Sequence, residues 1–449
     1  MLVDFSVENF LSFKDRQTIS FEPDTKVKGL EKYYFITIPD LNEKKKPLQL
    51  LKIGMIYGAN ASGKSNFLSA LSYMKTLMCQ SQERKELLLN YKPFANNYQN
   101  NSIMEANFVF NRVKYNYKVE FNKYLIVSEE LSVYPYLTSS SYKYVYKRQT
   151  DFDKQVPIIS FNPNLKVDPM VQKEAELRTL PNETVLAGFS KYSADIKPMK
   201  EVKDWCEMFE VDLVSPKLPI YYYAILEMGN NKNKMSNIAG LLQNADFNIS
   251  SVRVEEKHKT LVNDVFATAL GKNISSEASD YIRNNVSVQI SSGYEGGLPD
   301  VWLTHKTKDG AFELPLTLES DGTQRYLGLI GVLSYLVENS GIIILDELES
   351  SLHPELYEAF IVTYLKKCVS SQLLFTTHNR EFLQRKELIR KDSLWITNKR
   401  DDASSELYSF ADFDSSVLRN TTSIYNAYSI GKLGGVPNVS NDLMFYIKK

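Results

Sequence analysis

The distribution of hydrophobic and polar residues predicts strands that alternate with helices. Near the N-terminus, apolar residues dominate Leu2 to Val7 and Leu50 to Tyr57, and both stretches are expected to be strands. Helical spacing follows from Asn66 to Met78. Later in the chain, Asp321 to Val337 predicts a long apolar helix and Ile342 to Leu345 a strand buried on both faces. This alternation favours an α/β fold.

The middle of the chain has two different patterns. From Glu105 to Arg148, aromatic and β-branched residues alternate with polar ones, which predicts an antiparallel meander. Its end, from Tyr142 onwards, combines basic and aromatic residues. An exposed edge strand protected by lysines explains this better than stacking on nucleic acid. Residues 165–285 are expected to form a mainly helical lobe, and strands are predicted again at Val286 to Ile290 and Val301 to His305.

Composition narrows the class of protein. The chain has 449 residues, of which 43% are hydrophobic and 24% charged, so two or three globular domains are expected. Its 53 basic and 54 acidic residues give a net charge of −1, and this balance does not indicate a nucleic-acid-binding protein. The three cysteines (Cys79, Cys206 and Cys368) are too far apart in sequence to suggest disulfides or a metal site, which favours a reducing compartment.

No segment of the sequence has the pattern of a signal peptide or a membrane span. The first ten residues alternate apolar and polar and include Asp4 and Glu8. The longest apolar run, Tyr326 to Val337, is shorter than the roughly 20 residues that a spanning helix needs. We therefore expect a cytoplasmic protein without membrane contact.

The strongest chemical signal is an unbroken GxxxxGK[ST] pattern between the second strand and the helix that follows it. Its glycines, Gly58 and Gly63, let backbone N–H groups surround phosphate oxygens. Lys64 is expected to neutralise the β- and γ-phosphates of ATP, and the Ser65 hydroxyl to bind Mg²⁺. The predicted nucleotide-binding residues here are Gly58, Ala59, Asn60, Ala61, Ser62, Gly63, Lys64, Ser65 and Asn66.

Two acidic residues follow the buried strand Ile342 to Leu345. Asp346 is then expected at the carboxyl end of the sheet, where ligands bind in such folds, and it would hold Mg²⁺ directly or through water. Glu347 is the candidate general base that polarises the attacking water. Acidic residues also favour the first turn of a helix, but the phosphate loop makes the functional interpretation the stronger one.

Four further residues could take part in nucleotide chemistry. Ser320 and Gly322 precede the long apolar helix, where Ser320 or Asp321 would cap it and form a second anion site, facing nucleotide on another subunit. A plain helix cap is the alternative. His378 ends the apolar strand that starts at Gln372, and its imidazole could contact the γ-phosphate. His353, before Pro354, is a weaker candidate.

Taken together, these motifs resemble the ABC-type P-loop ATPases of the branch that holds SMC, RecF and OLD-like proteins. Ser320-Asp-Gly322 is similar to their signature motif, Leu352-His353-Pro354 to their D-loop, and His378 to their switch histidine. In this branch a large insertion separates the two Walker motifs. The resemblance thus implies a nucleotide-binding core at 1–125 and 330–449, split at 126–329 by an inserted meander and helical lobe that ends in the signature motif.

A closer resemblance extends over essentially the whole chain. Val7 to Asp15, Leu241 to Phe247 and Tyr428 to Pro437 are similar to segments of the RloA/AbiL class of AAA-type ATPases, which belong to bacterial restriction-linked and abortive-infection loci. Leu11 departs from this pattern, since relatives often have a basic residue there. No Q-loop glutamine is evident. The segment after His378 is too short for the TOPRIM domain of OLD-type nucleases, so we expect an ATPase without its own nuclease.

The resemblance implies an ATP- and Mg²⁺-dependent ATPase of a bacterial anti-phage defence system. It would form homo-oligomers with ATP between subunits, respond to nucleic acid or a phage protein, and control a separate effector such as a TOPRIM-type nuclease. A slowly hydrolysing, ATP-gated scaffold is a variant of this hypothesis. The main alternative is a RecF- or SMC-like ATPase that maintains duplex DNA; the net charge and the lack of long heptads disfavour it. The insertion and the imperfect signature also disfavour a transporter subunit.

Overall fold

The computed structural model describes residues 1–207, 211–214, 232–243, 248–255, 300–413 and 424–436, together with residues 220, 221, 224, 225, 228 and 245. The chain divides into two compact units. The first comprises residues 1–213, 340–347 and 369–449, and the second comprises residues 214–339 and 348–368. The predicted strand Val286 to Ile290 lies outside the described residues.

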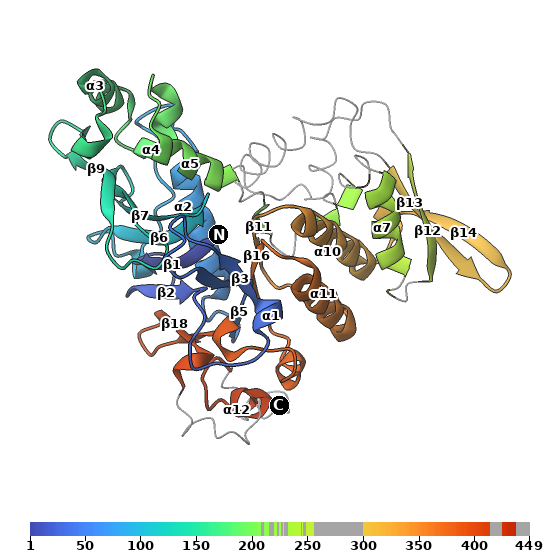
Figure 1. Ribbon diagram of the computed structural model, residues 1–449. Helices are drawn as coiled ribbons and strands as arrows, with labels where there is room; N and C mark the ends of the chain where they lie inside the picture. The colour runs from blue at the N-terminus through green and yellow to red at the C-terminus, as the bar shows by residue number, and fades with distance from the viewer. Residues whose placement is uncertain are drawn as a thin grey trace, which may run out of the picture. The chain divides into compact units, whose positions relative to one another are not determined.

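A six-stranded sheet in the first unit contains the strands that carry the nucleotide motifs. The strand order is β11-β15-β16-β5-β17-β18, in which β15, β16, β5 and β17 run parallel to one another and β18 is antiparallel to β17 (Figure 1). Parallel strands buried on both faces explain why β5 and β15 are uniformly apolar. The bounds are β5 (Ile53–Gly58), β11 (Val211–Val214), β15 (Ile342–Leu345), β16 (Gln372–Thr376), β17 (Leu394–Lys399) and β18 (Ser405–Ser409). The predicted α/β fold is therefore confirmed.

The single strand predicted from Leu50 to Tyr57 is two strands that join different sheets. The chain breaks at Lys52, whose N–H donates to Tyr34 O at 2.8 Å. The first part, β4 (Leu48–Leu51), forms an antiparallel hairpin with β3 (Phe35–Ile38), and the second part is β5. Continuous apolar sequence does not reveal such a break, because both strands are buried.

A second, seven-stranded sheet in the same unit confirms the antiparallel meander. Its order is β10-β9-β8-β7-β6-β1-β2, with every pair antiparallel. Asn111 and Arg112 form the β6–β7 turn with positive φ angles of 48° and 64°, a conformation that asparagine tolerates better than most residues. The bounds are β1 (Leu2–Glu8), β2 (Gln17–Ser20), β6 (Ser102–Phe110), β7 (Val113–Phe121), β8 (Ile126–Val133), β9 (Lys143–Asp151) and β10 (Val156–Phe161).

The interpretation of Tyr142 to Arg148 as an exposed edge strand is wrong. β9 lies between β8 and β10, so the edge position belongs to β10. Arg148 is buried and donates to Glu183 O at 2.9 Å and to Pro181 O at 3.0 Å. The carboxylate of Glu129 on the neighbouring strand accepts from Tyr146 Oη at 2.5 Å. These contacts account for Tyr146 and Arg148 without nucleic acid, whereas Tyr142, Lys143 and Lys147 are exposed.

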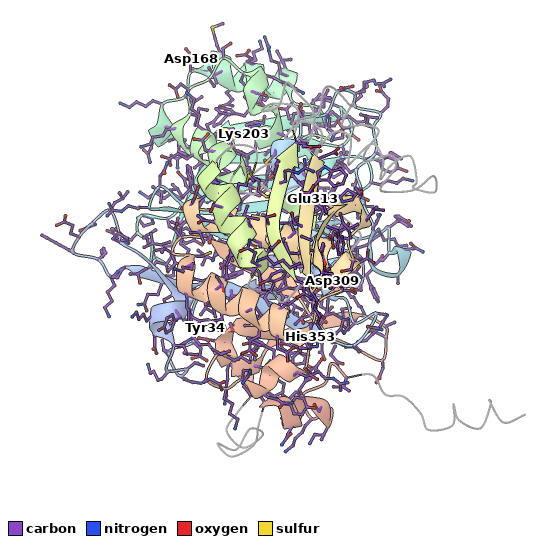
Figure 2. The ribbon with its side chains drawn as sticks, turned by 90° about the vertical axis from the view of Figure 1, so that its right-hand side faces the viewer. Tyr34, Asp168, Lys203, Asp309, Glu313 and His353 are labelled. Carbon is purple, nitrogen blue, oxygen red and sulfur yellow. The ribbon has the colours of Figure 1, made fainter. Side chains whose placement is uncertain are left out.

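The described helices of the first unit pack beside these sheets. The helix predicted at Asn66 to Met78 is α2, which starts two residues earlier. Asp168 caps α3 through its carboxylate, which accepts from Met170 N at 2.8 Å (Figure 2). The bounds are α1 (Glu31–Tyr34), α2 (Lys64–Cys79), α3 (Pro169–Arg178), α4 (Val185–Gly188), α5 (Lys197–Glu207) and α12 (Ile424–Ser429).

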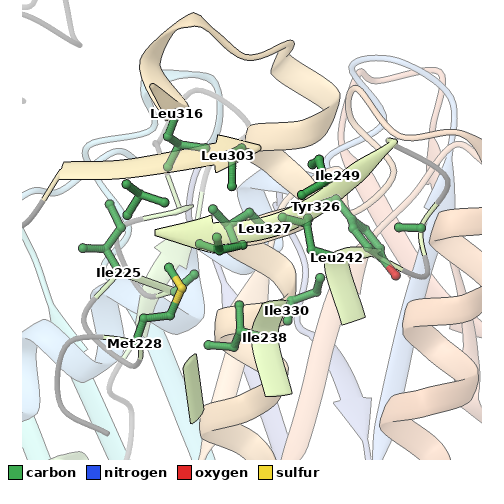
Figure 3. Packing of buried hydrophobic residues seen from close by; sticks show 14 residues of the cluster. Ile225, Met228, Ile238, Leu242, Ile249, Leu303, Leu316, Tyr326, Leu327 and Ile330 are labelled. Carbon is green, nitrogen blue, oxygen red and sulfur yellow. The ribbon is translucent and has the colours of Figure 1, made fainter. Parts of the chain in front are cut away.

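In its described residues, the second unit packs helices α7, α10 and α11 with a three-stranded antiparallel sheet of order β12-β13-β14. Its core joins apolar residues of α7 and α10 to the inward side of β12 and β13, with Leu327 and Leu303 fully buried (Figure 3). The long helix predicted from Asp321 is confirmed as α10. The bounds are α7 (Lys232–Gln243), β12 (Ile249–Glu255), β13 (Asp300–Thr307), β14 (Gly310–Pro315), α10 (Asp321–Glu338) and α11 (Pro354–Lys367).

The two compact units are defined by which residues pack together. The boundaries predicted at residues 125/126 and 329/330 instead separate a nucleotide-binding core from an inserted lobe. The seven-stranded sheet continues across residue 125, because β7 pairs with β8. Between residues 165 and 285 the structure describes helices α3, α4, α5 and α7 and also strands β11 and β12. The predicted core and insertion therefore stay a prediction.

Two other expectations concern the whole chain. In the described part, no helix combines the length and apolarity needed to cross a membrane. The three cysteines are free thiols.

Candidate nucleotide-binding site

The phosphate loop connects β5 to α2 in the first unit. Residues 59–62 form the turn after β5, and Gly63 takes the N-cap position of α2 with φ 111°. A residue with a Cβ at position 63 would have a strained backbone in this left-handed conformation, and its Cβ would lie 2.9 Å from Ser12 Oγ. No side chain caps the first N–H groups of α2, so these groups are available to phosphate oxygens.

Lys64 lies over this loop. Its side chain is buried, and Nζ donates to Gly58 O at 3.0 Å and to Ala59 O at 3.1 Å. An ammonium group held against the loop's own backbone is in the place where phosphate charge would be neutralised. The role of Lys64 in phosphate binding stays a prediction, and its position beside the loop is compatible with it.

Ser65 and Asp346 are brought together although they are far apart in sequence. Ser65, in the first turn of α2, donates from Oγ to Asp346 Oδ1 at 3.0 Å. The parallel register places Leu345, the last residue of β15, opposite Phe375, so Asp346 follows at the carboxyl end of the sheet. A hydroxyl and a carboxylate are hard oxygen ligands of the kind that Mg²⁺ prefers, and phosphates and water commonly supply the rest. These two residues therefore fit the predicted metal.

Thr376, which the sequence analysis did not select, joins the two acidic residues. Its Oγ1 donates to Asp346 Oδ1 at 2.6 Å and accepts from Glu347 N at 2.8 Å. Glu347 has φ 48°, a left-handed conformation that costs energy in a residue with a side chain. The hydroxyl of Thr376 stabilises this turn directly after Asp346. In the sequence, only the two threonines before His378 could have indicated a hydroxyl that supports the turn after Asp346.

His378 follows β16 at the same edge of the sheet. Partial burial is the main cause that lowers the pKa of His378 below its ordinary value of 6.5. The positive charge of Lys64 lowers the pKa further, and the negative charge of Asp346 opposes both effects. The lowered pKa favours the neutral imidazole, which lies within electrostatic reach of the lysine and the aspartate of the site.

A titration of His378 tests this arrangement. We expect NMR to give a pKa below 6.5 for its ring in the nucleotide-free protein, and a higher pKa in Lys64→Met, which lacks the nearby charge. Lys64→Arg keeps the charge and should keep the low pKa. Because the unfolded state binds the proton more tightly, this histidine lowers the free energy of unfolding as the pH falls through 6.5. An unchanged pKa in Lys64→Met would show that Lys64 does not act on His378.

Other side chains support the loop from segments that motif analysis did not identify. Asn66 on α2 donates from Nδ2 to Ser12 Oγ at 2.8 Å, so the N-terminal segment reaches the phosphate loop one residue after Leu11. The backbone of Ser12 in turn accepts from Ser405 N at 2.7 Å. The loop is therefore surrounded by hydroxyl groups from both ends of the chain.

Ser320, Gly322 and His353 belong to the second unit. Ser320 is the N-cap of α10 and accepts at Oγ from Thr323 N at 3.2 Å, which confirms the predicted cap. A Cβ at Gly322 would lie 2.9 Å from Ser351 O, so this position needs glycine for close packing. His353 precedes Pro354 at the start of α11, makes no side-chain cap there, and pairs with Glu355 (Figure 2).

Within the described ranges, no group of three His, Cys, Asp or Glu residues could hold a metal ion by itself. A magnesium ion bound with ATP needs no such group, since it usually keeps water and phosphate ligands beside one or two protein oxygens.

A buried strand, a glycine-rich loop, a helix that begins at lysine, and a neighbouring strand that ends in Asp-Glu define the class of P-loop nucleotide-binding proteins. Residues 54–384 match the AAA_21 family, described as "AAA domain, putative AbiEii toxin, Type IV TA system". This match covers well over half of the chain. The chain belongs to this AAA-domain family.

Solved structures give a weaker likeness. The chain is 12% identical to an SMC head bound to the C-winged helix domain of ScpA, over 91% of this chain and 97% of that one, with a TM-score of 0.39. It is 13% identical to the SMC head domain from Thermotoga maritima, over 91% and 98% of the two chains, with a TM-score of 0.36. No curated protein matches the sequence.

Proposed function

We propose that this protein hydrolyses ATP as the sensor of a bacterial anti-phage defence system and controls a separate effector. The observation that supports ATP hydrolysis is a series of hydrogen bonds that links Ser65 to Asp346, Asp346 to Thr376, and Thr376 to Glu347. Lys64, the residue before Ser65, contacts the phosphate loop. These contacts bring together in one unit the residues that we propose for phosphate binding, metal binding and water activation. The family description, which names a putative toxin of a Type IV TA system, supports a role in defence.

In the proposed mechanism, the phosphate loop and Lys64 hold the triphosphate. Bound Mg²⁺ would supply charge neutralisation at Ser65 and Asp346. Glu347, whose backbone is fixed by Thr376, takes the proton of the attacking water as general base. Neutral His378 donates or accepts a hydrogen bond near the γ-phosphate.

The proposal includes a second subunit. Ser320 and Gly322 at the start of α10 would face the γ-phosphate of ATP that the phosphate loop of another copy holds. The exposed side chain of Ser320 at the start of α10, where the helix dipole favours negative charge, supports such an anion contact. ATP would then close the homo-oligomer and hydrolysis would open it, which gives the effector a signal. The RloA/AbiL-like segments of the sequence suggest a nuclease as that effector, acting in the cytoplasm.

Affinity capture from the native cell tests this function. Tagged Glu347→Gln protein, captured with ATP and Mg²⁺, should retain one effector protein in stoichiometric amount, because ATP is bound but not hydrolysed. Lys64→Ala protein should lose that effector, since its phosphate loop would not hold ATP. Duplex DNA without an effector protein in the eluate would instead indicate a DNA-maintenance ATPase. Retention of the same effector by both variants would contradict control by ATP.

A further inference from the structure

Thr397 lies beside the phosphate loop on a strand that contains none of the recognised motifs. It belongs to β17, which pairs in parallel with β5 and places Thr397 opposite Gly58, the first glycine of the loop. Its side chain is fully buried. The close approach is tight, since a Cβ at Gly58 would lie 2.6 Å from Thr397 O.

The hydroxyl of Thr397 connects two parts of the loop. Thr397 Oγ1 donates to Tyr57 O at 3.3 Å, directly before Gly58. It also lies 2.6 Å from Ser62 Oγ, inside the loop. A hydroxyl has one proton, so Ser62 donates to Thr397 while Thr397 donates to Tyr57. Ser62 is itself only 2% exposed, which leaves its hydroxyl little access to water.

The strand that carries Thr397 is held in place by the C-terminal segment. Gly435 N donates to Asn398 Oδ1 at 3.3 Å, and Tyr428 Oη donates to Gly435 O at 2.9 Å. A Cβ at Gly435 would lie 3.4 Å from Gly58 Cα, so this segment also touches the loop. Thr397 therefore contacts the loop from a supported position.

We propose that Thr397 is a positioning residue for the phosphate loop and sets its affinity for nucleotide phosphates. The loop includes Ala61 with φ 60°, a left-handed conformation that surrounding contacts must maintain. The bond to Ser62 holds the residue next to that turn, and the bond to Tyr57 fixes where the loop leaves β5. This inference rests on the proposed binding of ATP, and it adds a residue that touches neither phosphate nor metal.

Thr397→Val tests the inference because it keeps the shape of the side chain and removes its hydroxyl. Without that partner, the buried Ser62 hydroxyl loses its bond, and we expect the Kd for ATP to rise on the order of tenfold. Thr397→Ser restores a hydroxyl and should restore tight binding. The matched control is Thr150→Val on β9, which removes another buried threonine hydroxyl, one that donates to Ile126 O at 2.5 Å. It should lower thermal stability without changing the Kd.

A double-mutant cycle separates the proposed route from general destabilisation. If Thr397 acts through Ser62, Thr397→Val should weaken binding far less in a Ser62→Ala background than in the wild-type protein. Equal ATP affinity of wild-type and Thr397→Val protein, or fully additive losses in the double variant, would overturn the inference. Failure of the wild-type protein to bind ATP would instead refute the proposed function.

Discussion

Lys64→Ala is expected to abolish measurable ATP binding, with the Kd raised at least on the order of a hundredfold. The Lys64 ammonium is buried against the carbonyls of Gly58 and Ala59, where bound phosphates would meet it. Hydrogen bonds to charged groups contribute about 1.5–3 kcal/mol each, and about 1.4 kcal/mol corresponds to a tenfold change in Kd. Alanine cannot replace the charge, and it leaves the loop carbonyls without their donor.

Calorimetric titration with a non-hydrolysable ATP analogue measures this effect. Lys173→Ala removes an exposed lysine from α3, away from the phosphate loop in sequence, and should bind the analogue as the wild-type protein does. Circular dichroism of both variants checks that they are folded. Wild-type affinity in Lys64→Ala would refute the assignment of the phosphate loop.

Glu347→Gln is expected to retain ATP and to slow its hydrolysis on the order of a hundredfold or more, the effect of losing a general base. Glutamine has the same shape and keeps the backbone N–H that donates to Thr376. It cannot accept the proton of the attacking water. Binding should therefore survive while the chemical step fails, and the substitution separates these two functions of the site.

Phosphate release under single-turnover conditions measures the rate, and filter binding measures the retained nucleotide. Glu174→Gln on α3 removes a carboxylate of equal size from a surface helix and should hydrolyse ATP at the wild-type rate. If Glu347→Gln also hydrolyses ATP at the wild-type rate, Glu347 has no part in the reaction.

The elements that carry the nucleotide motifs could be predicted because local sequence determines them. The helix after Gly63 and the strand before Asp346 occur where the pattern placed them, and the strand before Gly58 is the second part of the stretch predicted there. Such segments are buried on both faces or amphipathic, so their period and end signals are strong. The contact between Ser65 and Asp346 followed from the rule that ligands bind at the carboxyl ends of parallel strands.

The supporting residues could not be predicted, because they depend on which strands become neighbours. Thr376 and Thr397 lie on either side of the phosphate-loop strand because β16 and β17 pair with the two edges of β5. Neither threonine belongs to a recognised motif, and a buried threonine in a strand has no distinctive sequence pattern. Strand order is a property of the tertiary fold, and a single sequence does not display it.

The error at β9 has the same origin. Lysines and tyrosines that alternate are typical of an edge strand, yet β10 covers that edge and Arg148 turns into the interior. Arg148 can be buried there because two backbone carbonyls accept hydrogen bonds from its guanidinium group. A buried arginine with such partners cannot be distinguished by sequence from one on the surface.

The central claim is that one unit of this chain binds ATP at the phosphate loop and hydrolyses it through the acidic residues after β15. The most direct measurement follows bound nucleotide and released phosphate together in purified wild-type, Lys64→Ala and Glu347→Gln protein with ATP and Mg²⁺. The account predicts that the wild-type protein binds ATP and releases phosphate, Lys64→Ala does neither, and Glu347→Gln binds ATP without releasing phosphate. A wild-type protein that binds no ATP, or phosphate release from Lys64→Ala at the wild-type rate, would contradict it.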